Sequence, residues 1–433
     1  MSPVLVGVVS FAVLIITLLV GVPIALAMAV IGIAGYFVIT GGVPTLGMVA
    51  LIPWAKATRY TLTVCPPFIL MGNLIFYAGF GEDLYRAARR WAGHLPGGLA
   101  VTTVLACTGF AAACGSATAT AATMGRIAAP EMKKFGYDQR LSLGCVASAG
   151  TLAIMIPPSI AMVLYCSMTE QSISKMLIGG IFPGLLMALS YITMIVVRTR
   201  INPNLGPAVP RASWLDRFKS LRTVWGIVAI SIIVLGGLYT GVFVPTEAGS
   251  LGALGALIVG LTTRRLNMRL ILHALLDTAR TIGMIFLIVI GAFMFSAQFT
   301  VSRLPQELAA WVMGLDVPVL VVLIGLLLMY LIMGTFMETI PLLFLTVPVI
   351  FPMTVSLGIH PIWFGILIIH ATEMGMISPP FGITLFATKA SVPEASMGTI
   401  IQGIIPFLMA DIVVLSILVA FPQIPLFLPS LMK

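Results

Sequence analysis

The sequence predicts an all-α polytopic membrane protein, an inverted repeat with about ten transmembrane helices plus two re-entrant hairpins. Composition is the first reason, because the 433 residues are 60% hydrophobic and only 9% charged. The mean hydropathy is +1.13, and the core of a soluble protein cannot bury that much apolar surface. The second reason is that apolar runs of helix length recur along the chain. The third is that two proline interruptions occupy matching positions in its halves.

The first repeat is predicted to span residues 1–200. Its scaffold helices are expected from apolar runs near 3–20, 22–40 and 61–80. An amphipathic arm with three arginines then lies in the membrane interface. A hairpin turning at CGSATAT, a helix broken by two prolines and an unbroken helix complete the repeat. The predicted bounds are 3–80 for the scaffold helices, 82–93 for the arm, 97–132 for the inner hairpin, 138–167 for the broken helix and 173–197 for the last helix.

A polar segment, 198–222, separates the halves and carries six Arg or Lys residues. The positive-inside rule makes it a cytoplasmic linker. The second repeat, 223–433, is predicted to follow the same order as the first, with apolar runs near 223–243, 246–263 and 281–299. Its predicted bounds are 223–299 for the scaffold helices, 302–314 for the arm, 317–353 for the outer hairpin, 361–390 for the broken helix and 395–420 for the last helix.

The spacing of the prolines supports the repeat. Each half holds 14 prolines, and seven pairs coincide at an offset of 222 residues, where chance gives about one. The pairs include Pro157 with Pro379 and Pro158 with Pro380. Proline interrupts a helix, and an interrupted backbone at membrane depth is tolerated only where protein or a watery cavity satisfies the freed groups. Paired interruptions therefore point to the binding site of a transporter.

The basic residues predict opposite orientations for the two repeats. Clusters at 133–140, 198–222 and 264–269 are expected on the cytoplasmic side. The first arm has three arginines and the second has only Arg303, so we assign the first arm to the inner face and the second to the outer face. Each half then needs an odd number of crossings. Five crossings fit if each hairpin enters and leaves on one side.

Both hairpin tips combine glycine with hydroxyl side chains, and we expect them to meet the helix breaks. Glycine permits a tight turn, helix N-termini offer N–H groups to an anion, and C-terminal carbonyls suit Na⁺. The predicted substrate-binding residues are Ser116, Thr118, Thr120, Pro157, Thr335 and Pro379. The predicted sodium-binding residues are Gly115, Ser116, Thr118, Gly150, Thr151, Gly334, Thr335, Glu338, Thr339, Thr372, Glu373 and Gly375. The alternative is that the small residues only allow helices to pack closely.

The acids in apolar segments have two interpretations. Glu338 and Glu373 belong to the second site, or they accept hydrogen bonds from helix ends. Asp411 is assigned a structural role, and Glu247 in VPTEAG the role of a helix cap. His370 lies three residues before Glu373, so the pair could relay protons, although a buried histidine paired with a neighbour is more often structural.

Six motifs carry a family resemblance: PPFILMG at 66–72, GSATATAATMGRIAAPEM at 115–132, AGTLAIMIPPSIAMVLY at 149–165, IFPG at 181–184, VPTEAG at 244–249 and EMGMISPPFGITLF at 373–386. Over essentially its whole length the chain resembles the large membrane subunit (M, DctM-like) of the tripartite ATP-independent periplasmic (TRAP) transporters. The resemblance implies sodium-coupled import of an organic acid, such as a dicarboxylate or sialic acid, across a bacterial inner membrane. It also implies an elevator mechanism, with a transport domain moving against a scaffold. One departure is Ala117, where the family usually has a second serine.

The resemblance further implies two protein partners, a small four-helix membrane subunit (Q type) and a periplasmic substrate-binding protein (P type). Na⁺ is the implied coupling ion, and no cofactor is implied. One alternative is a self-sufficient organic-anion permease driven by sodium or protons, and a remote one is an intramembrane transferase. No nucleotide loop or nucleophile elbow occurs in the sequence, so an enzyme is not expected. The scattered basic residues favour a lipid bilayer and not nucleic acid as the surrounding partner.

Overall fold

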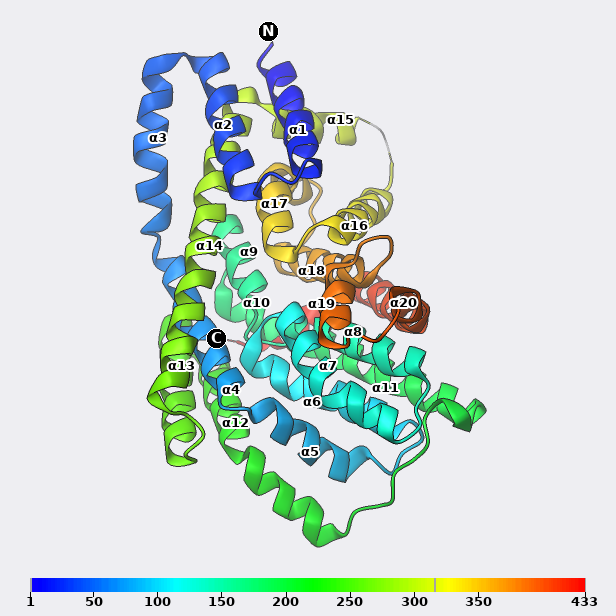
Figure 1. Cartoon of the computed structure of the whole chain (residues 1–433). Coiled ribbons are helices and arrows are strands. Elements are labelled where there is room, and N and C mark those ends of the chain that lie inside the picture. The colour runs from blue at the N-terminus through cyan, green and yellow to red at the C-terminus, as the bar shows by residue number, and fades with distance from the viewer. Residues whose placement is uncertain (1, 315–316, 433) are drawn as a thin grey trace.

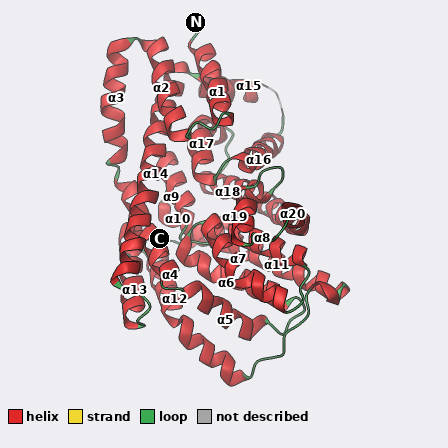
Figure 2. Ribbon diagram, in the orientation of Figure 1, coloured by secondary structure: helices red, strands yellow, loops and turns green. Residues whose placement is uncertain are grey.

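The computed structural model describes residues 2–314 and 317–432, and this part of the chain contains helices and loops but no strand (Figure 2). The helices of the first half are α1 (Pro3–Leu19), α2 (Ile24–Thr40), α3 (Gly42–Ala57), η1 (Tyr60–Val64), α4 (Cys65–Tyr77), α5 (Phe80–Ala92), α6 (Gly98–Cys114), α7 (Ala117–Lys134), α8 (Gln139–Met155), α9 (Ile160–Thr169), α10 (Ile173–Gly179), α11 (Ile181–Ile201) and η2 (Pro203–Leu205). Those of the second half are α12 (Trp214–Thr240), α13 (Pro245–Thr262), α14 (Met268–Ser302), α15 (Leu304–Met313), α16 (Val319–Phe336), α17 (Thr339–Ser356), α18 (Pro361–Ile377), α19 (Ile383–Ser391), α20 (Met397–Ala420) and α21 (Gln423–Leu431).

Local sequence signals set many of the helix starts. Asp138 caps α8, where its carboxylate accepts hydrogen bonds from the backbone N–H groups of Arg140 and Leu141. Glu247 accepts from the backbone N–H of Val244 at 3.1 Å, which confirms the predicted cap at the start of α13. Prolines in the first turn of α4, α13 and α18 cost no hydrogen bond, because the N–H groups there have no intrahelical partner.

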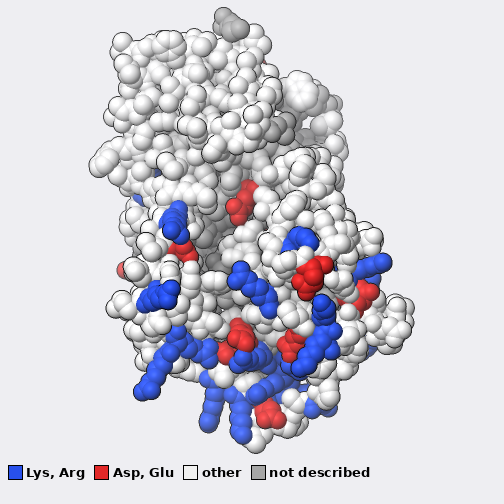
Figure 3. Space-filling view, in the orientation of Figure 1, with Lys and Arg blue, Asp and Glu red and all other residues white. Residues whose placement is uncertain are grey.

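The described helices confirm a polytopic membrane protein. Seven of them are long and apolar enough to cross a bilayer, or eight if α8 and α9 form one bent span. Four further apolar helices within the same part of the chain are shorter than 18 residues. The charged groups lie unevenly, since Lys and Arg side chains gather at the α5 end of the face shown in Figure 3. This one-sided distribution fits the positive-inside rule.

The two halves repeat the same order of elements. Helices α2, α5, α6, α7, α8 and α9 begin between 221 and 224 residues before α13, α15, α16, α17, α18 and α19. The two arms, α5 and α15, lie at opposite ends of the molecule, and each hairpin lies toward the end of its own arm (Figure 1). The repeats therefore place equivalent elements at opposite ends.

Two groups of packed helices make up the molecule. In one, the long helix α14 packs along α2, and α13 packs against α4 and α12. In the other, α7 packs on α8, α16 on α18, and α20 on α8. The interrupted helices form the centre of this second group, because every residue of α8 from Leu141 to Met155 is buried, and so is every residue of α18 from Phe364 to Ile377.

Several helix boundaries differ from those predicted. Helix α3 was not expected, because its sequence contains Pro53 and Lys56 and lacks a long apolar run. Helix α12 begins at Trp214, inside the predicted linker, so the segment between α11 and α12 shortens to 202–213. Helix α14 begins at Met268 and not near 281, because its first turns are charged yet helical. Apolar runs mark the membrane-embedded part of a helix and miss its polar extensions.

The shortened linker is fixed to the start of the first hairpin. The hydroxyl of Tyr137 donates to the carbonyl of Pro207 at 2.8 Å and accepts from the backbone N–H of Leu99 at 2.9 Å. The backbone N–H of Gly97 also donates to the carbonyl of Gly206 at 3.1 Å. These bonds hold 202–213 against the hairpin, although the segment has little regular structure of its own.

Candidate functional site

The tip of the first hairpin lies against the first helix break. Helix α6 ends at Cys114, Gly115 adopts a left-handed conformation with φ of +63°, and Ser116 caps α7. A Cβ atom on Gly115 would lie 3.0 Å from the carbonyl oxygen of Pro158, so only glycine allows this approach. The hydroxyls of Ser116 and Thr118 lie 3.3 Å apart at the tip. The structure thus brings these predicted residues together.

Gly150 completes the contact between this tip and α8. A Cβ atom at Gly150 would lie 2.7 Å from the Cβ of Ala121 and 3.1 Å from the carbonyl oxygen of Ala117. The Ala117 carbonyl therefore faces α8. Thr120 and Thr151 are both fully buried. The Thr151 hydroxyl donates to the carbonyl of Ser148 at 2.8 Å, within its own helix.

The second hairpin tip makes an even closer contact with the second break. A Cβ atom at Gly334 would lie 2.6 Å from the carbonyl oxygen of Thr372, and one at Gly375 would lie 2.5 Å from that of Leu331. Helices α16 and α18 therefore touch backbone to backbone. Beyond the break, the N–H of Gly382 donates to the carbonyl of Thr335 at 3.0 Å.

Glu338 faces a cavity beside the second tip. The cavity measures about 680 Å³ and is lined by Thr335, Glu338 and Phe381, together with apolar residues of α1 and α2. Glu338 is the N-cap residue of α17, but its side chain makes no capping hydrogen bond. Thr339, the next residue, is buried and its hydroxyl lies 3.2 Å from the Met376 sulfur. The second tip thus presents a carboxylate to a space that a ligand can enter.

The two breaks share one core. Helices α8 and α9 meet at a 41° bend, and α18 packs against both of them. The Tyr165 hydroxyl on α9 donates to the carbonyl of Pro361 at the start of α18, at 2.7 Å. Pro157 in the first break is buried, whereas Pro379 in the second is exposed. The second break is therefore the more accessible of the two.

Sequence reasoning missed a buried polar cluster next to these breaks. Asp411, to which the sequence assigned a structural role, accepts a hydrogen bond from the Tyr191 hydroxyl at 2.8 Å. The His370 Nε2 atom lies 3.3 Å from the Asp411 carbonyl oxygen. Glu373 lies three residues after His370, on the same face of α18, and is fully buried. His370 and Glu373 therefore lie on the side of α18 that faces α20, whereas Thr372 and Gly375 face the second tip. Only the spacing of His370 and Glu373 hinted at this cluster.

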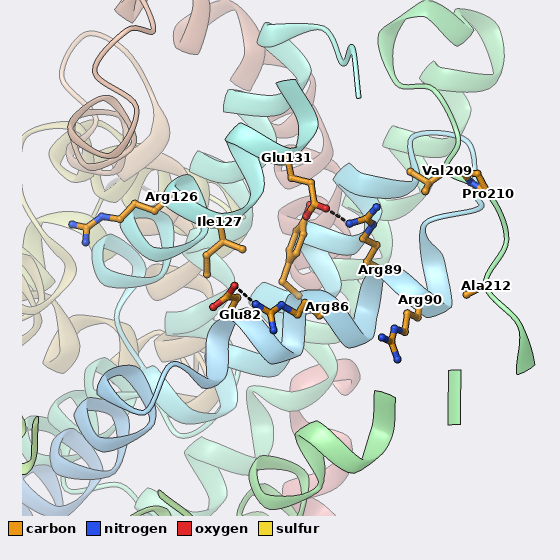
Figure 4. A pocket seen from close by; sticks show the side chains of 11 residues that line it. Glu82, Arg86, Arg89, Arg90, Arg126, Ile127, Glu131, Val209, Pro210 and Ala212 are labelled. Atoms are coloured by element: carbon orange, nitrogen blue, oxygen red, sulfur yellow. Dashed lines mark hydrogen bonds and ion pairs between the residues drawn. The ribbon is translucent and has the colours of Figure 1, made fainter. Parts of the chain in front are cut away.

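A second large cavity lies elsewhere, at the first arm (Figure 4). It measures about 800 Å³ and is bounded by α5, α7 and the 202–213 segment. Arg86 pairs with Glu82 and Arg89 with Glu131, while Arg126 points away from both pairs. None of the predicted substrate or sodium residues lines this cavity, so its size does not make it the transport site.

Paired hairpin tips set against two interrupted helices define a class of protein, the secondary membrane transporters with repeated halves. The chain belongs to the family described as tripartite ATP-independent periplasmic transporter, DctM component, whose model matches residues 11–424. This match confirms the family resemblance that the six sequence motifs indicated. Members of this family are transport permeases and not enzymes.

Two curated relatives illustrate the family. The chain is 38% identical to the C4-dicarboxylate TRAP transporter large permease protein DctM of Pseudomonas aeruginosa, over 86% of this chain and 87% of that protein. It is 32% identical to the sialic acid TRAP transporter large permease protein SiaM of Vibrio cholerae, over 86% and 87%. Among solved structures, the Alcanivorax borkumensis YdaH transporter matches with a TM-score of 0.65 at 15% identity, covering 98% of each chain. That likeness concerns the fold alone.

Proposed function

We propose that this chain is the large permease of a TRAP transporter and imports an organic acid coupled to Na⁺ by an elevator mechanism. The observation that carries the proposal is the close approach of a hairpin tip to a helix break in both halves, at Gly115 and at Gly334. Such contacts expose backbone carbonyls and helix N-termini at a shared place in the core. The C4-dicarboxylate and sialic acid permeases among the relatives support a carboxylate as the substrate.

Two Na⁺ sites follow from these contacts, each formed by one tip and one interrupted helix. In the first, Ser116, Thr118 and Gly115 supply oxygen atoms opposite Gly150 and Thr151. In the second, Gly334, Thr335 and Thr339 lie opposite Thr372 and Gly375, with Glu338 as the charged member. Carbonyl and hydroxyl oxygens at helix ends are suitable ligands for Na⁺. Glu373 would take part in the second site through its backbone alone, because its side chain lies on the face of α18 that meets α20.

The substrate carboxylate would lie between the two tips. The N-termini of α7 and α17 carry partial positive charge and free N–H groups, which favour an anion. The hydroxyls of Ser116, Thr118, Thr120 and Thr335 would complete its contacts, near Pro157 and Pro379. Glu338 would repel the anion unless a cation neutralised it, which gives a physical reason for binding Na⁺ before the substrate.

The elevator assignment divides the helices into two bodies. The scaffold would comprise α1–α4 and α12–α14, and the moving body the two hairpins, both broken helices, α11 and α20. The arms α5 and α15 would connect them, at the inner and outer membrane faces respectively. The permease would reside in a bacterial inner membrane with a small four-helix subunit and a periplasmic binding protein as partners. "Large permease" in the relatives' names fits the existence of a smaller subunit.

Alanine substitutions of Thr335 and Thr339 test the second Na⁺ site. The complete transporter would be reconstituted in vesicles and C4-dicarboxylate uptake measured against Na⁺ concentration. We expect both variants to need more Na⁺ for half-maximal uptake. Thr300→Ala is the matched control, since within the described part of the chain the Thr300 hydroxyl binds only the Ser296 carbonyl of its own helix, at 2.9 Å. Unchanged Na⁺ activation in both site variants would refute the site, and uptake by this chain without partners would favour a self-sufficient permease.

A further inference from the structure

We propose that the cavity at the first arm binds the phosphate group of an anionic phospholipid at the cytoplasmic face of the membrane. The cavity measures about 800 Å³ and lies between α5, α7 and the 202–213 segment (Figure 4). None of the residues assigned to the substrate or to Na⁺ lines it, so the proposal does not depend on the transport mechanism. A bound headgroup would connect the arm to the first hairpin.

The cavity lies where phospholipid headgroups are expected. Helix α5 is amphipathic and carries Arg86, Arg89 and Arg90. Lys and Arg side chains gather at this end of the molecule (Figure 3), which the positive-inside rule assigns to the cytoplasm. An amphipathic helix in the membrane interface lies among the headgroups, and the anionic ones attract basic residues near the surface.

The cavity carries more positive charge than its own acids can neutralise. On α5, Glu82 pairs with Arg86. Between the two helices, Arg89 of α5 pairs with Glu131 of α7 (Figure 4). Two positive charges therefore remain without an acidic partner in the lining, which selects for an anion. The charged residues that line the cavity are Glu82, Arg86, Arg89, Arg90, Arg126 and Glu131.

Arg90 and Arg126 are the arginines left to bind a ligand. The ion pairs formed within residues 2–314 and 317–432 include neither of them. Arg90 donates to the carbonyl of Asp216 at 3.1 Å, which uses one of the five N–H donors of its guanidinium. Arg89, already paired, also stacks over the ring of Phe135, 5.0 Å from its centre. A guanidinium presents two parallel N–H groups that match two oxygens of a phosphate.

The remaining wall of the cavity suits a lipid better than a free phosphate ion. Ile127 on α7 and Val209, Pro210 and Ala212 in the linker line the same space with apolar side chains. The linker wall is held in place because the N–H of Val209 donates to the carbonyl of Gly93 at 3.0 Å. A phospholipid can place its phosphate on the arginines and its glycerol and first methylene groups on this wall. Inorganic phosphate would use the arginines alone.

Tyr85 adds an unused donor to the lining. It is 1% exposed, and its hydroxyl makes no hydrogen bond within the described part of the chain. Buried hydroxyls normally have a partner. A phosphate oxygen, or a water molecule held by the headgroup, would supply the missing acceptor.

Native mass spectrometry of the purified full-length chain can measure this binding. The protein in detergent would be titrated with phosphatidylglycerol, with phosphatidylcholine and with inorganic phosphate. We expect phosphatidylglycerol, which is anionic, to bind more tightly than the zwitterionic phosphatidylcholine. The double variant Arg90→Gln with Arg126→Gln should weaken phosphatidylglycerol binding about 25-fold, because each arginine near a membrane surface contributes about five-fold.

Two further variants separate the cavity from the general charge of this face. Arg200→Gln with Arg269→Gln is the matched control, since it removes two exposed arginines that do not line the cavity. This control should bind phosphatidylglycerol as the wild type does. Glu82→Gln should strengthen binding, because it removes a negative charge from the lining and releases Arg86 from its ion pair. A loss of folding could not produce that gain.

The outcomes decide the proposal in either direction. Equal binding of the two lipids by the wild type, or equal losses in the cavity and control variants, would overturn it. Tight binding of inorganic phosphate without a preference between the lipids would assign the cavity to a free anion and reject the lipid. If the double cavity variant failed to fold, unchanged or weaker phosphatidylglycerol binding by Glu82→Gln would overturn the proposal, and stronger binding would support it.

Discussion

Substituting Gly334 by alanine should weaken Na⁺ binding by forcing the second tip away from its break. The added Cβ would lie 2.6 Å from the carbonyl oxygen of Thr372, whereas ordinary contact begins at 3.4 Å. Both groups belong to backbones inside helices, so neither can rotate aside. Helices α16 and α18 must separate by about 0.8 Å, and overpacking of this kind costs about 1–3 kcal/mol. If that strain opposes the bound state, Na⁺ affinity falls by about five-fold to about a hundred-fold.

Gly325→Ala is a matched control on the same helix. A Cβ atom at Gly325 would meet nothing within 4 Å, so this variant gains the same helix propensity without the collision. The assay is the rise in thermal unfolding temperature on adding NaCl at constant ionic strength, which reports ligand binding to the folded state. We expect Gly325→Ala to respond to Na⁺ as the wild type does. A wild-type response from folded Gly334→Ala, or equal losses in both variants, would refute the reasoning.

The remaining predictions concern contacts of the first arm. Arg89 on α5 pairs with Glu131 on α7, and reversing either charge alone should lower stability. Exchanging both charges should restore it. A double-mutant cycle on unfolding temperatures should give a coupling free energy of about 0.5–1 kcal/mol at low salt. Burial, followed by the charges of Arg217 and Arg211, lowers the pKa of His94. The neutral ring therefore supports the fold above its ordinary pKa of about 6.5, and this contribution is lost as pH falls through the lowered folded-state value. Fluorescence of the adjacent Trp91–Trp214 pair should change on acidification in the wild type and not in His94→Gln, and an identical response in both would exclude His94.

The sequence predicted the elements that carry periodic apolar residues and prolines, and missed those whose helical state depends on tertiary packing. Pro157 and Pro379 located both breaks, because each is followed by a second proline and the pair removes two consecutive backbone donors. Single prolines such as Pro130 and Pro406 lie inside continuous helices. The close contact of Gly334 with Thr372 agreed with the predicted meeting of tip and break. In contrast, helix α3 and the first turns of α12 and α14 carry polar or helix-breaking residues, so a hydropathy pattern passes over them.

The polar cluster shows why part of the buried chemistry could not be predicted. Asp411 and Tyr191 are 220 residues apart, and the hydrogen bond between them depends on the packing of α11 against α20. Glu373 was predicted to bind Na⁺ because it is an acid at the second break, and that assignment stays a prediction. His370, three residues before it, meets the Asp411 carbonyl on α20, which the spacing did not indicate. Spacing along a helix indicates which residues share a face and does not indicate what that face meets.

The length of α14 has a consequence for where the whole molecule can sit in a bilayer. Its 35 residues extend over about 52 Å, whereas the hydrocarbon layer measures about 30 Å. Arg269, Asp277 and Arg280 occupy the first 13 residues, so they stay in water while the next 22 residues fill the apolar layer. Sliding along the membrane normal would drag these charges into lipid. Helices α2 and α4, which pack along α14, therefore share its depth, and any vertical travel of α17, which also packs against α14, must slide along this fixed helix.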